Sequence, residues 1–235
     1  MQVDLNCDLG EGAAYDAELM PLVSSANIAC GAHAGDAATM RRTLELALQH
    51  GVAPGAHPGY HDRAHFGRRE LALAPAQIFQ LVCEQIRALQ QVAAGLGLAL
   101  THVKPHGALY NQAARDAALA DAVVAAVKAV DPRWILFGLA GSALITAARA
   151  RGLPAAEEVF ADRRYQADGS LLPRSRPDAL ILDPDEACSQ VMRLLRDGRA
   201  HTVCVHGDGP HAVTFARQLR SAFSQARIEI KPCTA

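Results

Sequence analysis

The sequence lacks the segments that would anchor a chain in a membrane or direct its export. No run of about 18 apolar residues occurs, which is the length that a helix needs to span a bilayer. The N-terminus, Met-Gln-Val-Asp-Leu-Asn, has neither the basic region nor the apolar region of a signal peptide. We therefore expect a cytoplasmic protein without a membrane partner.

An excess of charge of either sign is also absent. Lys and Arg number 23 and Asp and Glu number 24, which gives a formal net charge of -1. Because binding to nucleic acid depends on an excess of positive charge, we expect no nucleic-acid partner. The six cysteines form no Cys-x-x-Cys pair, and we expect them to be reduced thiols, as is usual in the cytosol.

A phosphate-binding loop is missing as well. The pattern Gly-x-x-x-x-Gly-Lys-Ser/Thr does not occur, so the chain does not bind ATP by that route. Gly138-Leu-Ala-Gly-Ser142, at the start of a predicted helix, could hold an anion on free backbone N–H groups, but a helix start alone is weak evidence.

What the sequence does contain is a repeated unit of strand, polar cluster and helix. Strands are expected at residues 3–9, 24–31, 52–56, 96–100, 134–139, 154–160 and 202–205, with a short additional one at 228–230. Helices are expected between Asp36 and Gly51, from Pro75, over about 116–130, up to Arg151, over 184–196 and from Pro210.

Seven such units in one chain predict a parallel α/β fold. Polar clusters at nearly all the strand ends favour a closed barrel, because in an open sheet the ligands gather at one switch point. Half of the residues are hydrophobic, which is enough for a large core, and no linker divides the chain. We therefore expect a single barrel domain over residues 1–235.

The densest polar cluster is His102-Val-Lys-Pro-His-Gly-Ala-Leu-Tyr-Asn111, directly after the apolar run 96–100. An ammonium, two imidazoles and a phenol are costly to bury without partners, so this cluster indicates chemistry rather than packing. Lys104 and His106 could transfer a proton or polarise a carbonyl. Alternatively, Lys104 could clamp an anion, form a Schiff base or pair with a carboxylate for stability, and Tyr110 could simply pack.

Three earlier strand ends carry Asp8, His33 and His57. Carboxylate and neutral imidazole suit zinc or a similar divalent ion, with positions left for water and substrate. The ligand spacing is not the tight one of His-Glu-x-x-His, so only the position of these residues supports a metal. The alternative is that they fix strand ends or bind substrate without a metal.

Charged groups also follow the later strands. Asp162-Arg163-Arg164-Tyr165 and Arg68-Arg69 could hold a carboxylate or phosphate bidentately at a barrel rim, or they could be solvated charge runs. Asp162 could orient an arginine or act as a base. His206-Gly-Asp208 follows the last strong strand, where Asp208 could also cap the next helix.

Six motifs occur in order along the chain. They are Asp4-Leu-Asn-Cys-Asp-Leu-Gly-Glu11, Ser25-Ala-Asn-Ile-Ala-Cys-Gly31 with His33-Ala-Gly-Asp36, Gly55-Ala-His-Pro-Gly-Tyr60, His102-Val-Lys-Pro-His-Gly-Ala-Leu-Tyr110, Glu158-Val-Phe-Ala-Asp-Arg-Arg-Tyr165 and Cys204-Val-His-Gly-Asp208. Together they resemble the LamB/YcsF family, which supplies the A subunit of bacterial 5-oxoprolinase. The chain departs from the family pattern in a shorter segment between Glu11 and Glu18 and in a missing insertion between Arg196 and Thr202. The first departure lies beside the predicted site and bears on substrate scope.

The resemblance implies a distorted (β/α)7 barrel, TIM-barrel-like and of the type found in glycoside hydrolases and carbohydrate deacetylases. It also implies ATP-dependent hydrolysis of the lactam of 5-oxoproline (pyroglutamate) to L-glutamate, together with partner subunits B and C. Because the chain lacks a phosphate-binding loop, we expect the partners to phosphorylate or deliver the substrate and this barrel to hydrolyse the activated ring.

On this hypothesis, each candidate residue takes one of three roles. The catalytic residues are Asp8, Lys104, His106, Asp162 and Asp208; the substrate-binding residues are Asn6, Arg68, Arg69, Tyr110, Arg163 and His206; and the metal ligands are Asp8, His33 and His57. Two other functions stay open. One is a stand-alone metal-dependent amide hydrolase or carbohydrate deacetylase, and the other is a non-catalytic subunit that only binds substrate.

Overall fold

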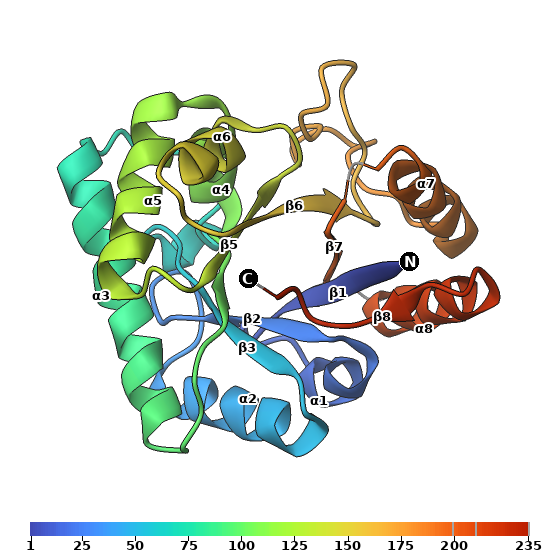
Figure 1. The fold of residues 1–235 in the computed structure, drawn as a ribbon, viewed down its shortest axis with the longest axis horizontal. Helices are drawn as coiled ribbons and strands as arrows, with labels where there is room; N and C mark the ends of the chain where they lie inside the picture. The colour runs from blue at the N-terminus through green and yellow to red at the C-terminus, as the bar shows by residue number, and fades with distance from the viewer. Residues whose placement is uncertain (199, 210, 235) are drawn as a thin grey trace.

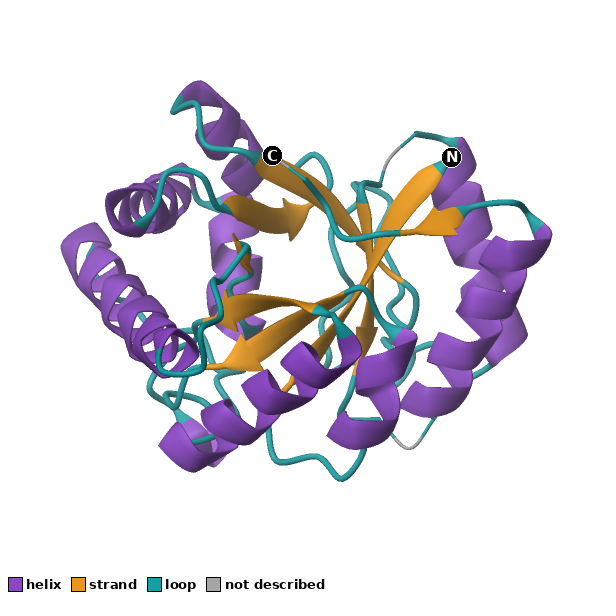
Figure 2. Ribbon diagram, turned by 60° about the horizontal axis from the view of Figure 1, so that its bottom comes forward, coloured by secondary structure: helices purple, strands orange, loops and turns teal. Residues whose placement is uncertain are grey.

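The computed structural model describes residues 1–198, 200–209 and 211–234, and its central feature is a closed barrel of parallel strands. The strands are β1 (Gln2–Leu9), β2 (Ser25–Ala29), β3 (Ala53–His57), β4 (His102–Val103), β5 (Ile135–Leu139), β6 (Ala155–Phe160) and β7 (Thr202–His206). Their order is β2-β3-β4-β5-β6-β7-β1, and a parallel pairing of β1 with β2 closes the ring. Helices surround these strands (Figure 2). The predicted TIM-barrel-like (β/α)7 fold is therefore confirmed.

The helices connect successive strands on the outside of the barrel. They are α1 (Asp16–Leu19), α2 (Ala37–His50), α3 (Pro75–Ala94), α4 (Gly107–Arg115), α5 (Ala117–Val130), α6 (Ala143–Ala150), α7 (Pro184–Arg196) and α8 (Ala212–Gln225), with short 3-10 turns η1 (Met20–Leu22) and η2 (Arg63–His65). The side chain of Asp36 caps α2 by accepting from Thr39 N, and Gly51 ends that helix with a φ of 65°. The predicted start of the last helix, Pro210, lies outside the described residues.

The predicted strand at 96–100 is wrong. Residues 95–97 form a turn after α3, in which Leu98 N donates to Ala93 O and Gly97 takes a left-handed φ of +70°. The leucines of this run pack on the core from outside the barrel instead of pairing in it. A short apolar run of this kind cannot be distinguished from a buried strand by periodicity alone. The real strand, β4, begins at His102 and carries it into the barrel.

The side chains of β1 face alternately the hydrophobic core outside the barrel and the interior of the barrel. Val3, Leu5, Cys7 and Leu9 belong to the hydrophobic core that the helices cover. The side chains between them point into the barrel, where they contact strands on the far side. The part of the barrel interior that β1 lines is therefore polar, although bulky aliphatic side chains fill most barrels of this kind.

Hydrogen bonds satisfy these buried polar side chains. Asn6 Nδ2 donates to Glu158 Oε1 (2.9 Å) and Thr202 Oγ1 (2.6 Å). Asn27 Nδ2 donates to Asn6 Oδ1 (2.7 Å) and Asp8 Oδ1 (2.8 Å). Because these bonds join β1 to β2, β6 and β7, the network can rigidly position the side chains at the carboxyl ends of the strands.

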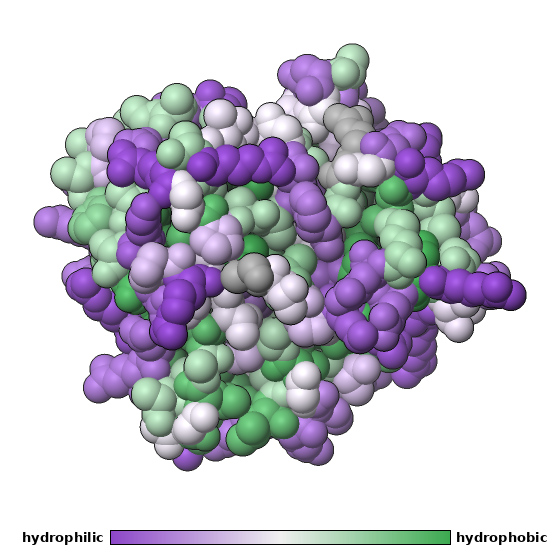
Figure 3. All heavy atoms as spheres, viewed as in Figure 1, coloured by the Kyte–Doolittle hydropathy of each residue, from purple (hydrophilic) through white to green (hydrophobic). Residues whose placement is uncertain are grey.

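The C-terminal segment closes the opposite end of the barrel. The strand β8 (Glu229–Ile230) pairs with the first residues of β1, which confirms the predicted short final strand. In Figure 1 the red segment that follows β8 runs towards the centre of the ring of strands, and Cys233 packs on the inner residues Ile135, Phe137 and Ala156. On this face, polar and hydrophobic residues are interspersed (Figure 3). Among the described residues, no helix is long and apolar enough to cross a membrane.

Candidate active site at the carboxyl ends of the strands

A cavity of about 850 Å³ opens at the carboxyl ends of the strands. The candidate residues that line it come from most of the strand ends and from the following loops. They are Asp8, His57, Arg68, Lys104, His106, Tyr110, Arg163 and His206, and the loop residue Arg174 joins them. Active sites of barrels of this type lie at this end, because the loops that follow the strands converge there.

Lys104 lies at the floor of this cavity and is 2% exposed. Its Nζ lies 2.9 Å from Asp8 Oδ1, 3.0 Å from Glu158 Oε1 and 2.9 Å from Cys204 Sγ. Burial lowers the pKa of Lys104, but the negative charges around it, that of Asp8 first, raise this pKa well above its ordinary value. A Schiff-base nucleophile needs a neutral amine, so the structure favours the alternative of an ion-paired Lys104.

Asp8 is the carboxylate that joins Lys104 to the histidines. Its Oδ1 is held by Lys104 and Asn27, and its Oδ2 lies 3.4 Å from His57 Nε2 and 4.0 Å from His206 Nε2. Burial raises the pKa of Asp8, but the positive charges of His57 and Lys104 together bring it well below its ordinary value. Asp8 is therefore an ionised hydrogen-bond acceptor in the cavity wall.

Next to Asp8, one glutamate and three histidines converge in a group that could hold a metal ion: Glu11, His33, His57 and His106. Glu11 Oε1 lies 3.3 Å from His33 Nε2, 3.1 Å from His106 Nδ1 and 3.6 Å from His57 Nε2. Burial raises the pKa of Glu11, but hydrogen bonds from His106 and His33 lower it far below its ordinary value. The group therefore offers one anionic oxygen and three imidazole nitrogens.

Backbone carbonyls fix the orientation of two of these rings. His57 Nδ1 lies 2.7 Å from Lys104 O, and His106 Nε2 lies 2.8 Å from Phe66 O, so each donates its proton outward. The inner nitrogens, His57 Nε2 and His106 Nδ1, then face each other at 3.0 Å. Two lone pairs so close need a proton or a metal cation between them. Outward N–H donation to carbonyls is the usual support of metal-binding histidines, so this group fits a divalent metal.

Two glycines make room for His33. Its ring stacks on that of His106 with centroids 3.7 Å apart, and burial lowers its pKa to about 4. A Cβ atom at Gly59 would lie 2.8 Å from His33 Nδ1, and one at Gly67 would lie 2.8 Å from His33 Cβ. Any side chain at these glycines would displace the ring, so the long loop after β3 is built to position this histidine.

The predicted metal ligands are distributed over two groups. His33 and His57 belong to the group with Glu11, whereas Asp8 belongs to a second group with Cys204 and His206. The ammonium of Lys104 lies 2.9 Å from both Asp8 Oδ1 and Cys204 Sγ, so a cation is already present in the second group. The first group is therefore the better candidate, and it includes Glu11, which the sequence-based ligand set lacks.

Three arginines surround the outer part of the cavity. Arg163 is 4% exposed, donates from Nη2 to Leu172 O (2.7 Å), and its Nε has no hydrogen-bond partner among the described residues. Burial and the nearby charge of Arg174 lower its pKa to about 10. Arg68 is paired with Asp208, and Arg174 Nη1 lies 3.8 Å from the same carboxylate. This arrangement suits a bound anion.

The other predicted arginine positions point elsewhere. The side chain of Arg69 is 60% exposed, lies 3.7 Å from Asp62 and is outside the cavity lining. Arg164 points away from the cavity and pairs with Glu186 on α7. Of the two arginine pairs, the structure thus places one member of each, Arg68 and Arg163, at the cavity.

Two other predicted substrate-binding residues differ in their access to the cavity. Asn6 is fully buried in the barrel interior, where its amide is hydrogen-bonded, and is outside the cavity lining. Tyr110 does line the cavity, and its hydroxyl has no hydrogen-bond partner among the described residues. Burial, and then the charge of Glu158, raise the pKa of Tyr110 well above its ordinary value, so it is a neutral hydroxyl.

Asp162 lies behind His206 at the ends of β6 and β7. Both of its carboxylate oxygens are 2.9 Å from His206 Nδ1. Burial raises the pKa of Asp162, but the charge of His206 and their hydrogen bond lower it below its ordinary value. Asp162 therefore contacts a histidine of the cavity.

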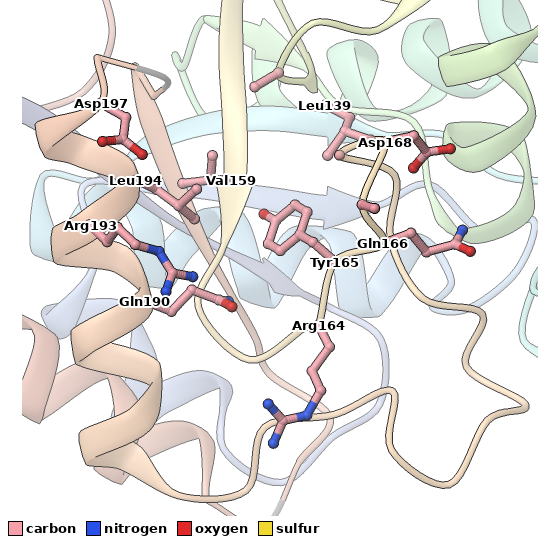
Figure 4. A pocket seen from close by; sticks show the side chains of 13 residues that line it. Leu139, Val159, Arg164, Tyr165, Gln166, Asp168, Gln190, Arg193, Leu194 and Asp197 are labelled. Carbon is pink, nitrogen blue, oxygen red and sulfur yellow. The ribbon is translucent and has the colours of Figure 1, made fainter.

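A second, smaller cavity of about 340 Å³ lies between α7 and the segment that follows β6. Figure 4 shows Gln190 and Arg193 on α7, and Asp197 directly after this helix, opposite Gln166 and Asp168. Its lining includes none of the strand-end histidines or carboxylates described above. We therefore place the candidate chemistry in the larger cavity.

Sequence reasoning missed several residues of this site. Glu11 follows β1 between two glycines, a position that could have marked it as a strand-end residue like the others. Asn27 alternates with the polar Ser25 along β2. Glu158 directly follows Glu157 in β6, so no alternation marks it. Arg174 comes from a loop rich in Gly, Pro and Ser, and no local pattern marks it.

Comparisons with known proteins agree with the geometry. A model of the LamB/YcsF family matches residues 3–235. The chain belongs to the LamB/YcsF family. It is similar to the crystal structure of a lactam utilization protein from Thermus thermophilus, with 44% sequence identity and a TM-score of 0.91 over 98% of this chain and 99% of that one.

Two more distant structures share the fold. The first is the catalytic domain of a peptidoglycan N-acetylglucosamine deacetylase from Eubacterium rectale, with 13% identity and a TM-score of 0.57 over 99% of this chain and 88% of that one. The second is a family 4 carbohydrate esterase from Streptomyces lividans in complex with acetate, with 13% identity and a TM-score of 0.51 over 97% and 91% of the two chains. At this identity the likeness concerns the fold alone.

Proposed function

We propose that this chain is the A subunit of an ATP-dependent 5-oxoprolinase, which hydrolyses the lactam of 5-oxoproline to L-glutamate together with B and C partner subunits. Membership of the LamB/YcsF family and the similarity to a lactam utilization protein support a role in lactam hydrolysis. The observation that carries the proposal is a single cavity that is lined both by a carboxylate–histidine wall and by three arginines.

These two kinds of lining group match the two ends of the substrate. 5-Oxoproline has a carboxylate, which the guanidinium groups of Arg68, Arg163 and Arg174 would bind. The buried Nε of Arg163, which has no partner within the part of the chain that the structure describes, is a donor that still needs an acceptor. The lactam carbonyl would then face the carboxylate–histidine wall, where Asp8 can accept a proton from an attacking water.

The glutamate and histidines of the same wall would assist the attack of water on the ring. Glu11, His57 and His106 would hold a divalent metal, with His33 as a fourth donor. When bound, such an ion supplies a Lewis acid that lowers the pKa of a coordinated water. Lys104 holds Asp8 in place and adds positive charge at the cavity floor, where it would stabilise negative charge of the transition state.

The need for ATP follows from the chemistry of the substrate. A lactam is a poor electrophile at neutral pH, and phosphorylation of the amide oxygen would activate it. This chain has no phosphate-binding loop, so the B and C subunits would carry out or complete that activation and this barrel would hydrolyse the activated ring.

The proposal is tested with the purified chain, with and without B and C subunits and ATP, by measuring glutamate release and metal content in the same sample. We expect glutamate only when all components are present. His106→Ala should reduce the rate at least about 100-fold, because it removes one donor of the carboxylate–histidine wall. His50→Ala, at the exposed end of α2, is the matched control. Full turnover by His106→Ala would remove the histidine group from the mechanism.

A second candidate function is a stand-alone, metal-dependent amide hydrolase or carbohydrate deacetylase. The donor group of one carboxylate and three imidazoles favours it, because such a set can support hydrolysis without ATP. It predicts stoichiometric zinc and turnover by the chain alone. A chain that only binds substrate would instead show changed affinity, and no changed rate, when strand-end residues are substituted.

A further inference from the structure

We infer that His206, oriented by Asp162, is the proton donor to the ring nitrogen of the lactam when the C–N bond breaks. The sequence pattern suggests the reverse assignment, with Asp162 as the catalytic residue and His206 as a substrate contact. The inference rests on the proposed function, because the leaving group it protonates is the lactam nitrogen.

The geometry of the pair supports this assignment. His206 Nδ1 lies 2.9 Å from each carboxylate oxygen of Asp162, and its backbone N–H donates to the same carboxylate at 3.4 Å. The ring also stacks on Phe160 with centroids 5.3 Å apart. These contacts fix the ring and direct Nε2 into the cavity, 4.0 Å from Asp8 Oδ2. A carboxylate behind one imidazole nitrogen is the arrangement that orients a histidine for proton transfer at the other.

The other cationic or imidazole groups of the cavity wall are already engaged. The inner nitrogens of His57 and His106 face each other at 3.0 Å, and their outer nitrogens donate to backbone carbonyls. Lys104 is surrounded by Asp8, Glu158 and Cys204 and keeps its protons. Among the imidazoles in the cavity lining, His206 is the one whose cavity-facing nitrogen has no hydrogen-bond partner within 3.5 Å in the described residues.

The chemical step balances with side chains of the cavity and water. Water adds to the ring carbon of the O-phosphorylated lactam, whose nitrogen keeps its own proton, and one proton of this water passes to Asp8. The C–N bond then breaks, its electron pair stays on nitrogen, and the proton on His206 Nε2 forms the new N–H bond of the amine, while the second proton of the water passes to solvent. A second water hydrolyses the acyl phosphate that remains to the side-chain carboxylate of glutamate and inorganic phosphate. Asp162 stays ionised and stabilises the imidazolium before transfer, and water returns a proton to His206 afterwards.

The test uses the complex reconstituted with B and C subunits, ATP and 5-oxoproline. His206→Gln should lower kcat for glutamate release by about 100- to 10,000-fold, the usual range for loss of a general acid, and change KM less than about 3-fold. His50→Gln is the control for loss of a histidine far from the cavity, and circular dichroism and a melting curve check folding. If kcat is retained, or if only KM rises, His206 does not donate the proton.

A double-mutant comparison tests the role of Asp162 as a positioning residue. Asp162→Asn should also lower kcat, and the double variant Asp162→Asn/His206→Gln should be no slower than His206→Gln alone, because Asp162 acts through His206. Multiplicative losses would show an independent role and contradict the inference. If the wild-type complex releases no glutamate, the proposed function itself is wrong and this inference falls with it; an active wild type beside a fully active His206→Gln contradicts the inference alone.

Discussion

Replacing Lys104 by methionine should destabilise this protein far more than any surface charge change. The ammonium is 2% exposed and lies 2.9 Å from Asp8 and 3.0 Å from Glu158, both buried. Lys104→Met removes the cation and leaves these carboxylates without their counter-ion. Breaking a buried ion pair by removing one partner costs about 3–5 kcal/mol, which is a large part of the stability of an ordinary domain.

The assay is equilibrium unfolding in urea, with the free energy of unfolding extrapolated to water. Lys231→Met is the control, because that lysine is half exposed and its pair with Glu229 should contribute at most about 1 kcal/mol. The double variant Lys104→Met/Glu158→Gln should recover part of the loss, since it removes one uncompensated charge. A Lys104→Met protein within about 1 kcal/mol of the wild type would refute the view that this ion-pair network stabilises the barrel floor.

Two further predictions concern His102 in the barrel interior. Burial lowers the pKa of His102 to about 3. As the pH falls below about 6.5, the unfolded chain therefore binds a proton at His102 while the folded chain does not. The free energy of unfolding should decline by about 2 kcal/mol between pH 6.5 and 5 for this reason. His102→Gln should remove that part of the decline in unfolding experiments at the two pH values, and an unchanged slope would contradict it. Gly55→Ala should destabilise by about 1–3 kcal/mol, because its Cβ would lie 2.2 Å from the His102 ring, which is stacked on Phe137. Gly95→Ala, with its nearest atom at 3.4 Å, is the matched control, and equal stability of the two variants would exclude this tight contact.

The fold could be predicted from sequence because its signals are local and repeated. Each strand-like run is followed by polar residues and a helix, and the alternation in β1 already separates core positions from interior ones. The error at 96–100 has a physical cause, because a turn through Gly95 and Gly97 can carry apolar side chains to the core as well as a strand can. Tertiary packing decides whether such an apolar run forms a strand of the barrel or a turn that packs on the core.

The candidate site was predictable where it depends on the ends of strands. Asp8, His57, Lys104 and His206 lie at one cavity because parallel strands end on the same side of a barrel. Positions on long loops were not predictable in this way. Arg68 reaches the cavity and Arg69 beside it does not, a difference that depends on the path of the loop after β3 rather than on residue type.

The central claim is that this barrel opens a lactam as one part of an ATP-dependent complex. The most direct measurement is glutamate release and ATP consumption, followed together, by the chain alone and by the chain combined with B and C subunits on 5-oxoproline. The account predicts that glutamate forms only in the complete mixture and in proportion to the ATP consumed. Release of glutamate, or deacetylation of an N-acetylated sugar, by the chain alone and without ATP would contradict it.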